Sequence, residues 1–240
     1  MPHDAPTPLL AGRRAAGDRR TLGWAATGLA GAGLLVGLTV APEDAVQGQA
    51  QRLMYLHVPT AWTAYLAFFT VLVASLGFLA WDDPRWDRAA RAAAELGLAL
   101  TVVTFAAGMI WGRLTWGVWW AWDPRIVSTI AMALIYSGQL TLRWTDADRR
   151  RGARRAARLG VGGFLVVPLV HFSVVWWRSL HQQATVLAPD ASPPIDALML
   201  TGLLLCVAAC TVAGAWWFLR RLATLERRAG VGAAEPAPVP

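Results

Sequence analysis

Two histidines and a dense run of tryptophans are the residues best suited to chemistry in this chain. From Trp111 to Arg125 the sequence reads WGRLTWGVWWAWDPR, so five of the 14 tryptophans fall within twelve residues. Indole faces offer large rigid areas for stacking, and neutral imidazole is the commonest side-chain ligand for metals. His57 stands in the segment YLHVP and His181 in RSLHQ. Together these residues could stack on a flat ligand and coordinate a metal.

The composition indicates which elements must position these residues. The chain has 240 residues, of which 56% are hydrophobic and 15% charged, whereas soluble chains are about 45–50% apolar and about 25% charged. This excludes a secreted disulfide scaffold, a disordered or collagenous chain, and a soluble enzyme built on a parallel sheet. Six nearly uncharged runs approach the roughly 20 residues that span a bilayer: 22–40, 60–81, 96–111, 126–142, 159–177 and 197–219. We therefore predict an all-α polytopic membrane protein, a bundle of six transmembrane helices.

Arginine distribution predicts the orientation of this bundle. All 22 basic residues are arginine, and 18 of them lie in the N-terminal tail, the second and fourth connections and the C-terminal tail. The first, third and fifth connections contain Arg52, Arg113, Arg125 and Arg178. The positive-inside rule then places both termini in the cytoplasm. The predicted division is a mobile cytoplasmic tail (1–21), a transmembrane domain (22–219) and a second mobile cytoplasmic tail (220–240).

The arginine-rich fourth connection, which begins at Arg143, has two interpretations. It could be a solvated loop lying on anionic lipid headgroups, or a docking site for nucleic acid or a protein. We favour the first, because the membrane topology already explains the charge. Membrane lipid is thus an expected partner, and nucleic acid is not.

Prolines and one acid predict local structure. Pro59, Pro84, Pro124 and the pair 193–194 are expected at helix starts, where the missing N–H is not needed, and Pro168 is expected to kink the fifth run. Asp123 is a plausible N-cap. Cys206 and Cys210, four residues apart in an apolar run, are expected to be small packing residues without a disulfide.

In this topology His57, His181 and the tryptophan-rich third connection all lie on the outer face of the membrane. A flat, apolar ligand with an acidic edge and a central metal would use all of them, and heme fits best among common cofactors. The four arginines of the outer connections could pair with its carboxylates. His57, expected just before the second helix, would be kept neutral by the helix dipole. The alternatives remain open: tryptophans are common at membrane interfaces, and an interfacial histidine is often only a surface residue.

These motifs resemble the heme exporter protein C family, also called cytochrome c maturation protein C. The similarity rests on the "WWD" run WGVWWAWD, on YLHVP, and on HFSVVWWRSLHQ from His171. It implies that His57 and His181 are axial ligands of heme b on the periplasmic side of a bacterial inner membrane, N-in and C-in. The other heme-binding residues that it implies are Trp116, Trp119, Trp120, Trp122, Asp123 and Arg125.

The resemblance also implies partners. The heme, a transferred ligand, would pass to a periplasmic heme chaperone with the help of a small single-span subunit. An ABC-type ATPase and a second membrane subunit would be associated. Iron with two histidine ligands has no open site for a substrate, so we expect a heme-handling protein rather than an enzyme and assign no catalytic residues.

Two other functions stay open at this stage. A b-type cytochrome electron-transfer subunit would place histidine pairs within its spans, and only His171 is expected there. We interpret His171 as hydrogen-bonded between helices or as a neighbour of the heme site. A plain ABC permease subunit would have no heme site of its own, and its tryptophans would only be interfacial.

Overall fold

The computed structural model describes residues 8–181 and 195–234, and side chains are described for 20–181 and 195–230. All named elements of this part of the chain are helices, and it has no named strand. Its elements are α1 (Pro8–Leu35), the π-helix η1 (Val36–Val40), the 3-10 helix η2 (Gln49–Leu53), α2 (Met54–Trp81), α3 (Pro84–Trp116), α4 (Pro124–Thr145), α5 (Arg149–Gly163), α6 (Val166–Trp176) and α7 (Ala197–Ala234).

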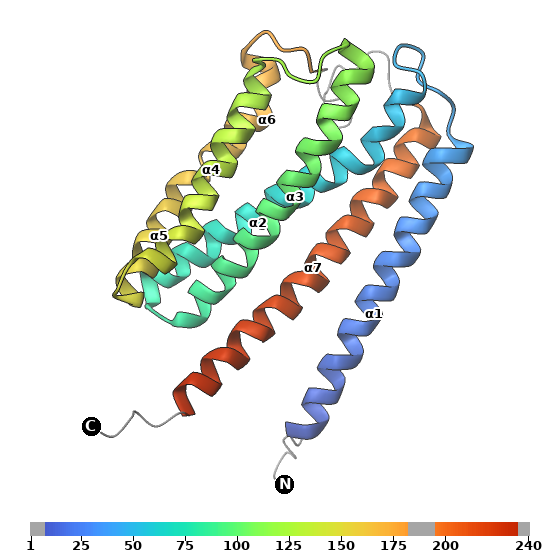
Figure 1. Ribbon diagram of the computed structural model, residues 1–240. Coiled ribbons are helices and arrows are strands. Elements are labelled where there is room, and N and C mark those ends of the chain that lie inside the picture. Colours follow the sequence, from blue (N-terminus) through green and yellow to red (C-terminus); the bar gives the residue numbers. More distant parts are fainter. Residues whose placement is uncertain (1–7, 182–194, 235–240) are drawn as a thin grey trace.

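Six helical segments are long and apolar enough to cross a membrane, as predicted: Arg20–Val40, Gln49–Trp81, Pro84–Trp116, Pro124–Thr145, Arg149–Trp176 and Ala197–Gly230. The helices α2 and α3 pack against each other in the middle of the bundle. The pair α1 and α7 flanks them on one side, and α4, α5 and α6 lie on the other (Figure 1). The fifth span therefore consists of two helices, α5 and α6.

The proline predictions are confirmed at three positions. Pro84 and Pro124 open α3 and α4, each after an N-cap aspartate. Near Pro168 the fifth span breaks between Gly163 and Val166. Proline has no N–H to donate to the Phe164 carbonyl four residues earlier, and that carbonyl instead accepts the N–H of Val167 at 3.0 Å. The predicted kink is this break. The pair 193–194 lies outside the described residues.

Three boundaries differ from the predictions. Because η2 runs directly into α2, the second helix begins before Pro59, so Pro59 lies inside it and His57 is its fourth residue rather than a residue preceding it. Most arginines of the expected fourth loop lie on α5, which begins at Arg149 after the N-cap Asp148. The terminal helices extend into the expected tails, since α1 begins at Pro8 and α7 ends at Ala234. Whether the tails are mobile stays a prediction.

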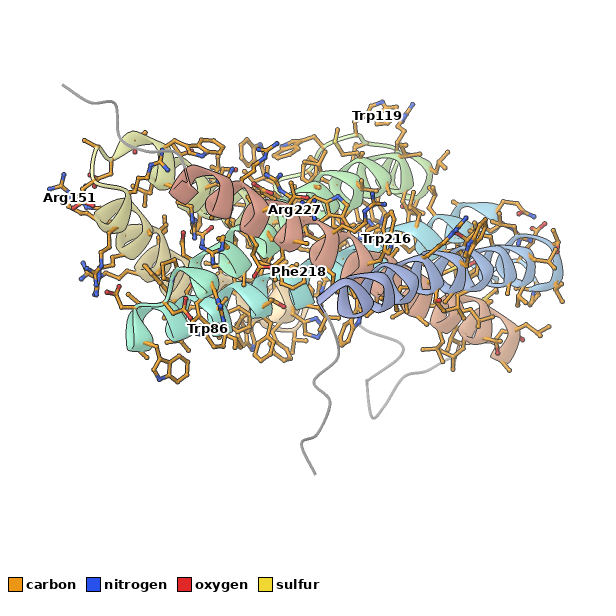
Figure 2. The ribbon with its side chains drawn as sticks, turned by 90° about the horizontal axis from the view of Figure 1, so that it is seen from below. Trp86, Trp119, Arg151, Trp216, Phe218 and Arg227 are labelled. Atoms are coloured by element: carbon orange, nitrogen blue, oxygen red, sulfur yellow. The ribbon has the colours of Figure 1, made fainter. Side chains whose placement is uncertain are left out.

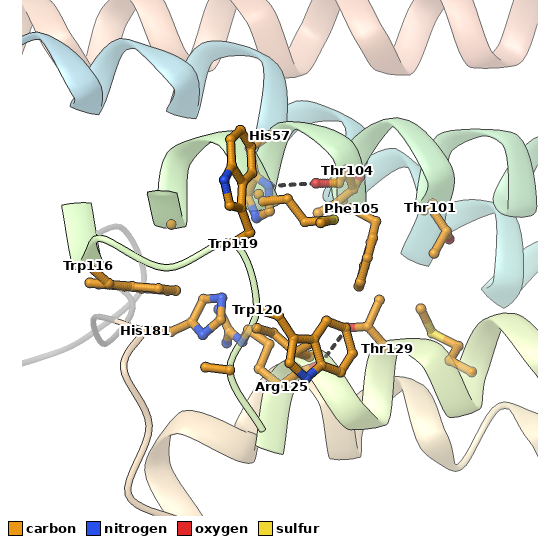
Figure 3. Close-up of a pocket in the computed structure, with 18 of the residues that line it drawn as sticks. His57, Thr101, Thr104, Phe105, Trp116, Trp119, Trp120, Arg125, Thr129 and His181 are labelled. Atoms are coloured by element: carbon orange, nitrogen blue, oxygen red, sulfur yellow. Dashed lines mark hydrogen bonds between the residues drawn. The ribbon is translucent and has the colours of Figure 1, made fainter. Parts of the chain in front are cut away.

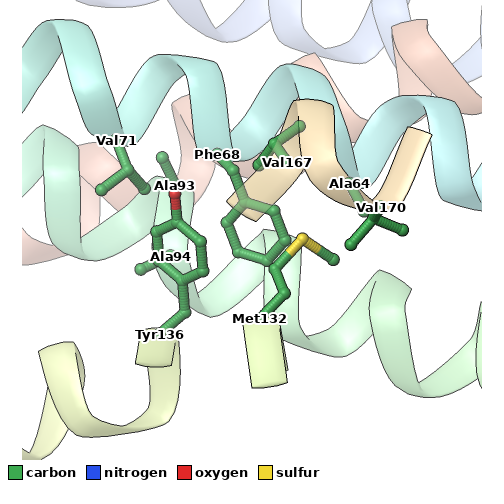
Figure 4. Packing of buried hydrophobic residues seen from close by; sticks show 9 residues of the cluster. All are labelled: Ala64, Phe68, Val71, Ala93, Ala94, Met132, Tyr136, Val167 and Val170. Atoms are coloured by element: carbon green, nitrogen blue, oxygen red, sulfur yellow. The ribbon is translucent and has the colours of Figure 1, made fainter. Parts of the chain in front are cut away.

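Small residues let the helices approach closely around the main core (Figure 4). Phe68 of α2 stacks on Tyr136 of α4 with ring centroids 3.8 Å apart. A Cβ at Gly97 of α3 would lie 2.5 Å from the Phe68 ring, so only glycine fits there. Helix association in membranes depends on such close packing of small residues. Both cysteines are free, and Cys206 packs in a second cluster with Tyr55 and Met199, as expected.

Ion pairs tie the helices together at the end of the bundle where α2 ends and α3 begins. Arg143 of α4 donates to Asp87 of α3 at 2.9 Å. Glu95 of α3 accepts from Arg91 at 3.0 Å and from Arg221 of α7 at 2.5 Å. Hydrogen bonds from Arg151 and a turn N–H lower the pKa of Asp146 at the start of α5. The helices are thus cross-linked by charge at the end where the chain carries most of its arginines.

Candidate functional site

A pocket opens at the opposite end of the bundle, where α2 begins and α3 ends (Figure 3). It contains both histidines that the sequence singled out, His57 from α2 and His181 from the segment after α6. Aromatic and arginine side chains complete its mouth: Phe105, Trp116, Trp119, Trp120 and Arg125. Its floor reaches Met132 and Ala64 of the main core. The enclosed volume is about 90 Å³.

The ring of His57 has a fixed tautomer. Its Nδ1 lies 2.9 Å from the main-chain carbonyl oxygen of Thr104 on α3. A carbonyl can only accept a hydrogen bond, so Nδ1–H donates and Nε2 carries a lone pair. Trp111 packs edge-on against this ring with centroids 5.7 Å apart, and donates from Nε1 to Gln47 at 2.7 Å. His57 is therefore held with its free nitrogen available for a ligand.

His181 has a matching arrangement built on Asp123. Its Nδ1 lies 3.1 Å from Oδ1 of that carboxylate, so Nδ1–H donates and Nε2 is again the free nitrogen. Asp123 also accepts from the Ser179 hydroxyl at 2.8 Å and the Leu180 N–H at 2.7 Å. It accepts the Arg125 N–H at 3.0 Å as the N-cap of α4. One carboxylate thus caps a helix and fixes the segment that carries His181.

The charge states of this pair follow from its surroundings. Burial lowers the pKa of His181, and the nearby Asp123 carboxylate opposes this only in part. Burial would raise the pKa of Asp123, but hydrogen bonds from Ser179 and Leu180 and the proximity of His181 bring that pKa below its usual value. At neutral pH the pair is therefore an ionised carboxylate and a neutral imidazole, the form that binds metals.

Arg125 places an unsatisfied donor at the pocket wall. Its Nη2 donates to the main-chain carbonyl of His171 at 2.9 Å. Its Nε is buried and has no hydrogen-bond partner among the described residues. A buried guanidinium N–H without a partner is costly. Arg125 also lines the pocket, so its guanidinium places a positive charge beside it.

The structure brings together most of the residues predicted for the site. His57, His181, Trp116, Trp119, Trp120 and Arg125 line one pocket, and Trp116 lies edge-on to His181 with centroids 4.9 Å apart. Asp123 is buried behind His181 rather than in the lining. Trp122 is 83% exposed, packs edge-on against Trp120, and does not line the pocket.

The remaining outer arginines do not join the pocket lining. Arg52 donates to the main-chain carbonyls of Gly37 and Ala41, and Arg113 donates to that of Gly117. These two groups stabilise chain turns at this end of the bundle. Arg125 is thus the arginine that the fold delivers to the pocket.

Two features of the pocket were not predicted from the sequence. The Thr104 carbonyl that orients His57 is a main-chain group, so no side-chain pattern could have indicated it. Gly108 permits the approach of His57, because a Cβ there would lie 2.8 Å from the ring atom Cε1. The spacing of Gly108 and Gly112 on α3 is the small-residue pattern of close helix packing, and it could have been noticed.

His171 lies next to the pocket, as one of its two interpretations expects, because its ring contacts the lining residue Tyr65. Its ring is exposed on α6, in edge contact with Tyr65 and Phe172, and makes no hydrogen bond within the described residues. The interhelical hydrogen bond expected of it uses its main-chain carbonyl, with Arg125 as the donor. The imidazole itself does not line the pocket.

Comparison with known proteins gives a consistent result. The family model "Heme exporter protein C" matches residues 11–233. A protein of that name from Bradyrhizobium diazoefficiens is 39% identical over 182 residues, 75% of this chain and 69% of the relative. A protein of the same name from Haemophilus influenzae is 35% identical over 80% of this chain and 78% of the relative. A putative cytochrome c biosynthesis ccmC-like mitochondrial protein of Marchantia polymorpha is 32% identical, with 68% of each chain covered. With its six spans and its histidine pocket, the chain belongs to the heme exporter protein C family.

Proposed function

We propose that this protein holds heme b between His57 and His181 and hands it on for the assembly of c-type cytochromes. The main support is the hydrogen bonding of the two histidines, which both line the same pocket. His57 donates its Nδ1–H to the Thr104 carbonyl and His181 to the Asp123 carboxylate, which leaves both Nε2 atoms free. Metal-binding histidines nearly always have such an acceptor on the second nitrogen, because it sets the tautomer and the ring direction.

Other pocket residues suit the porphyrin ring and the propionates of heme. Trp116, Trp119 and Trp120 offer aromatic surface at the mouth of the pocket, and the unpartnered Nε of Arg125 suits a propionate. The pocket is not fully enclosed, so we expect one edge of a bound heme to remain outside it. An exposed edge would allow another protein to take the heme.

We infer the setting from the family and the arginine distribution. The pocket faces the periplasm of a bacterial inner membrane, and both termini are cytoplasmic. A periplasmic heme chaperone receives the heme, and a small single-span subunit assists. An ABC-type ATPase and a second membrane subunit complete the complex. With both axial positions filled by histidine, the iron has no open site for a substrate, so the protein presents heme and is not an enzyme.

Absorption spectroscopy of the purified protein tests the axial ligands. His57→Ala and His181→Ala are each expected to abolish or sharply reduce the co-purifying heme spectrum. His171→Ala is the matched control, because its ring lies outside the pocket, and it should retain heme. Wild-type heme content in both pocket variants would overturn the assignment.

The two other functions give different results in the same preparation. A b-type cytochrome subunit would be reduced by a quinol and turn over, whereas the proposed protein binds heme without turnover. A permease subunit without its own heme site would show no heme spectrum in any variant.

A further inference from the structure

A second cavity lies between α1 and α7, toward the end of the bundle opposite the histidine pocket. This groove has a volume of about 690 Å³. Ten residues from the two helices line it: Arg20, Gly23, Trp24, Ala26, Thr27, Ala213, Trp216, Arg220, Thr224 and Arg227. Figure 2 looks toward this end of the molecule and labels Trp216 and Arg227 on α7. The pair α1 and α7 lies at the edge of the bundle, so the groove faces the surroundings of the protein (Figure 1).

The lining of this groove is positively charged. Three of its residues are arginines, and among the described side chains its lining contains no carboxylate. None of Arg20, Arg220 and Arg227 forms an ion pair within the described part of the chain. Arg91, Arg143 and Arg221, at the same end of the bundle, are all paired with acids. Among the described side chains, the groove thus has three positive charges and no acid that neutralises them.

Two of the three arginines contact neighbouring side chains of α7. The Arg220 guanidinium lies over the Trp216 ring, 4.8 Å from its centroid, and Arg227 donates to the Thr224 hydroxyl at 3.1 Å. Gly23 of α1 lies against the Trp216 indole, since a Cβ there would be in van der Waals contact with Nε1 at 3.4 Å. Trp24 is 68% exposed beside them. Tryptophan and arginine at the end of a span are the side chains that suit the headgroup level of a bilayer.

We propose that this groove binds the headgroup of an anionic phospholipid. The arginines would contact its phosphodiester, and Trp24 and Trp216 would lie against the start of the acyl chains. The groove borders two spans, Arg20–Val40 and Ala197–Gly230, so the acyl chains can remain in the bilayer beside α1 and α7. This site is separate from the heme pocket and does not depend on heme binding.

Native mass spectrometry on the full-length protein can test this. Delipidated protein is mixed with vesicles of phosphatidylglycerol or phosphatidylcholine, and the retained lipid is counted. Wild type should retain phosphatidylglycerol preferentially. Each basic residue near an anionic headgroup adds about 1 kcal/mol to the binding free energy of the lipid. Loss of one arginine should therefore weaken lipid retention about fivefold, and the double variant Arg220→Gln with Arg227→Gln should weaken it about thirtyfold.

The matched control is Arg228→Gln, which removes the same charge from an exposed neighbour outside the groove. It should retain phosphatidylglycerol like wild type. The melting temperature should stay at the wild-type level in every variant, which confirms that they fold. Equal loss in the Arg228 variant, or equal retention in all variants, would overturn the site. Displacement of the lipid by millimolar inorganic phosphate would show that the groove binds free phosphate and would overturn the lipid assignment.

Discussion

The same three residues, aspartate, proline and arginine, begin two neighbouring helices at opposite ends of the bundle. Asp83-Pro84-Arg85 opens α3, and Asp123-Pro124-Arg125 opens α4. The N-caps have nearly the same backbone angles, with φ −85° and ψ 121° in one and φ −81° and ψ 139° in the other. Each aspartate accepts the arginine N–H, at 2.9 Å and 3.0 Å. Local sequence thus produces the same helix start twice.

The surroundings of the two helix starts give their aspartates and arginines different contacts. Within the described residues, the Asp83 side chain only caps its helix, and Arg85 is exposed. Asp123 is 4% exposed and also holds Ser179, Leu180 and His181, while Arg125 lines the pocket. A short motif determines the cap, but only the packing of α6 beside α4 makes one copy part of the histidine pocket.

The largest expected effect comes from replacing the two aspartates with asparagine. Asparagine can still cap a helix, so Asp83→Asn should leave heme affinity unchanged. In Asp123→Asn, the amide cannot accept from both its helix and the Ser179 and Leu180 donors, and His181 loses its charged partner. Loss of such a partner typically weakens metal binding roughly 10–100-fold. Heme titration followed by absorbance measures this, and equal affinities would contradict the role given to Asp123.

A smaller effect is expected at the two arginines. Arg125→Gln should weaken binding of heme roughly tenfold, because it removes a charge-assisted hydrogen bond, and Arg85→Gln should not. The sharper measurement compares heme with its dimethyl ester, which has no carboxylate. Wild type and the Arg85 variant should prefer heme, and the Arg125 variant should bind both equally. A preference that survives Arg125→Gln would show that the propionates lie elsewhere.

Gly108→Ala should have a lesser effect. The added methyl would lie 2.8 Å from Cε1 of His57 and must push the ring from its place. Heme binding must return the ring to its ligand position against this methyl, which costs about 1 kcal/mol, the lower end for overpacking, so heme affinity should fall about fivefold. Gly28→Ala on α1 is the control, because no atom lies within 4 Å of the added carbon. An undisturbed affinity in Gly108→Ala would mean that His57 is not fixed against α3.

The smallest effect concerns pH in the heme-free protein. The pKa of His181 is lower in the folded chain than its usual 6.5, so below that pH the unfolded chain takes up the proton first and stability falls. Asp123 adds no slope there, because its lowered pKa keeps it ionised. The melting temperature of wild type should therefore drop more between pH 7 and 5 than that of His181→Gln. Parallel curves would contradict the lowered pKa.

Much of the fold could be predicted, because a bilayer requires long apolar helices and proline has few places in them. The six spans, the starts at Pro84 and Pro124 and the break near Pro168 are confirmed. The sequence predicts the start of α2 too late, because Pro59 tolerates a position inside the first turns of the helix. It predicts a loop where α5 lies, because the number of arginines indicates the side of the membrane and not the local structure.

The sequence by itself determined that the chain has six spans and that His57, His181 and the tryptophan run from Trp111 to Trp122 lie at one end, since both follow from hydrophobicity and charge along the chain. Tertiary structure decided which of these residues meet. It placed a main-chain carbonyl of α3 behind His57, put Asp123 behind His181, and left Trp122 and His171 outside the pocket. These outcomes depend on how helices distant in sequence pack and rotate against each other, which a pattern of residue types does not specify.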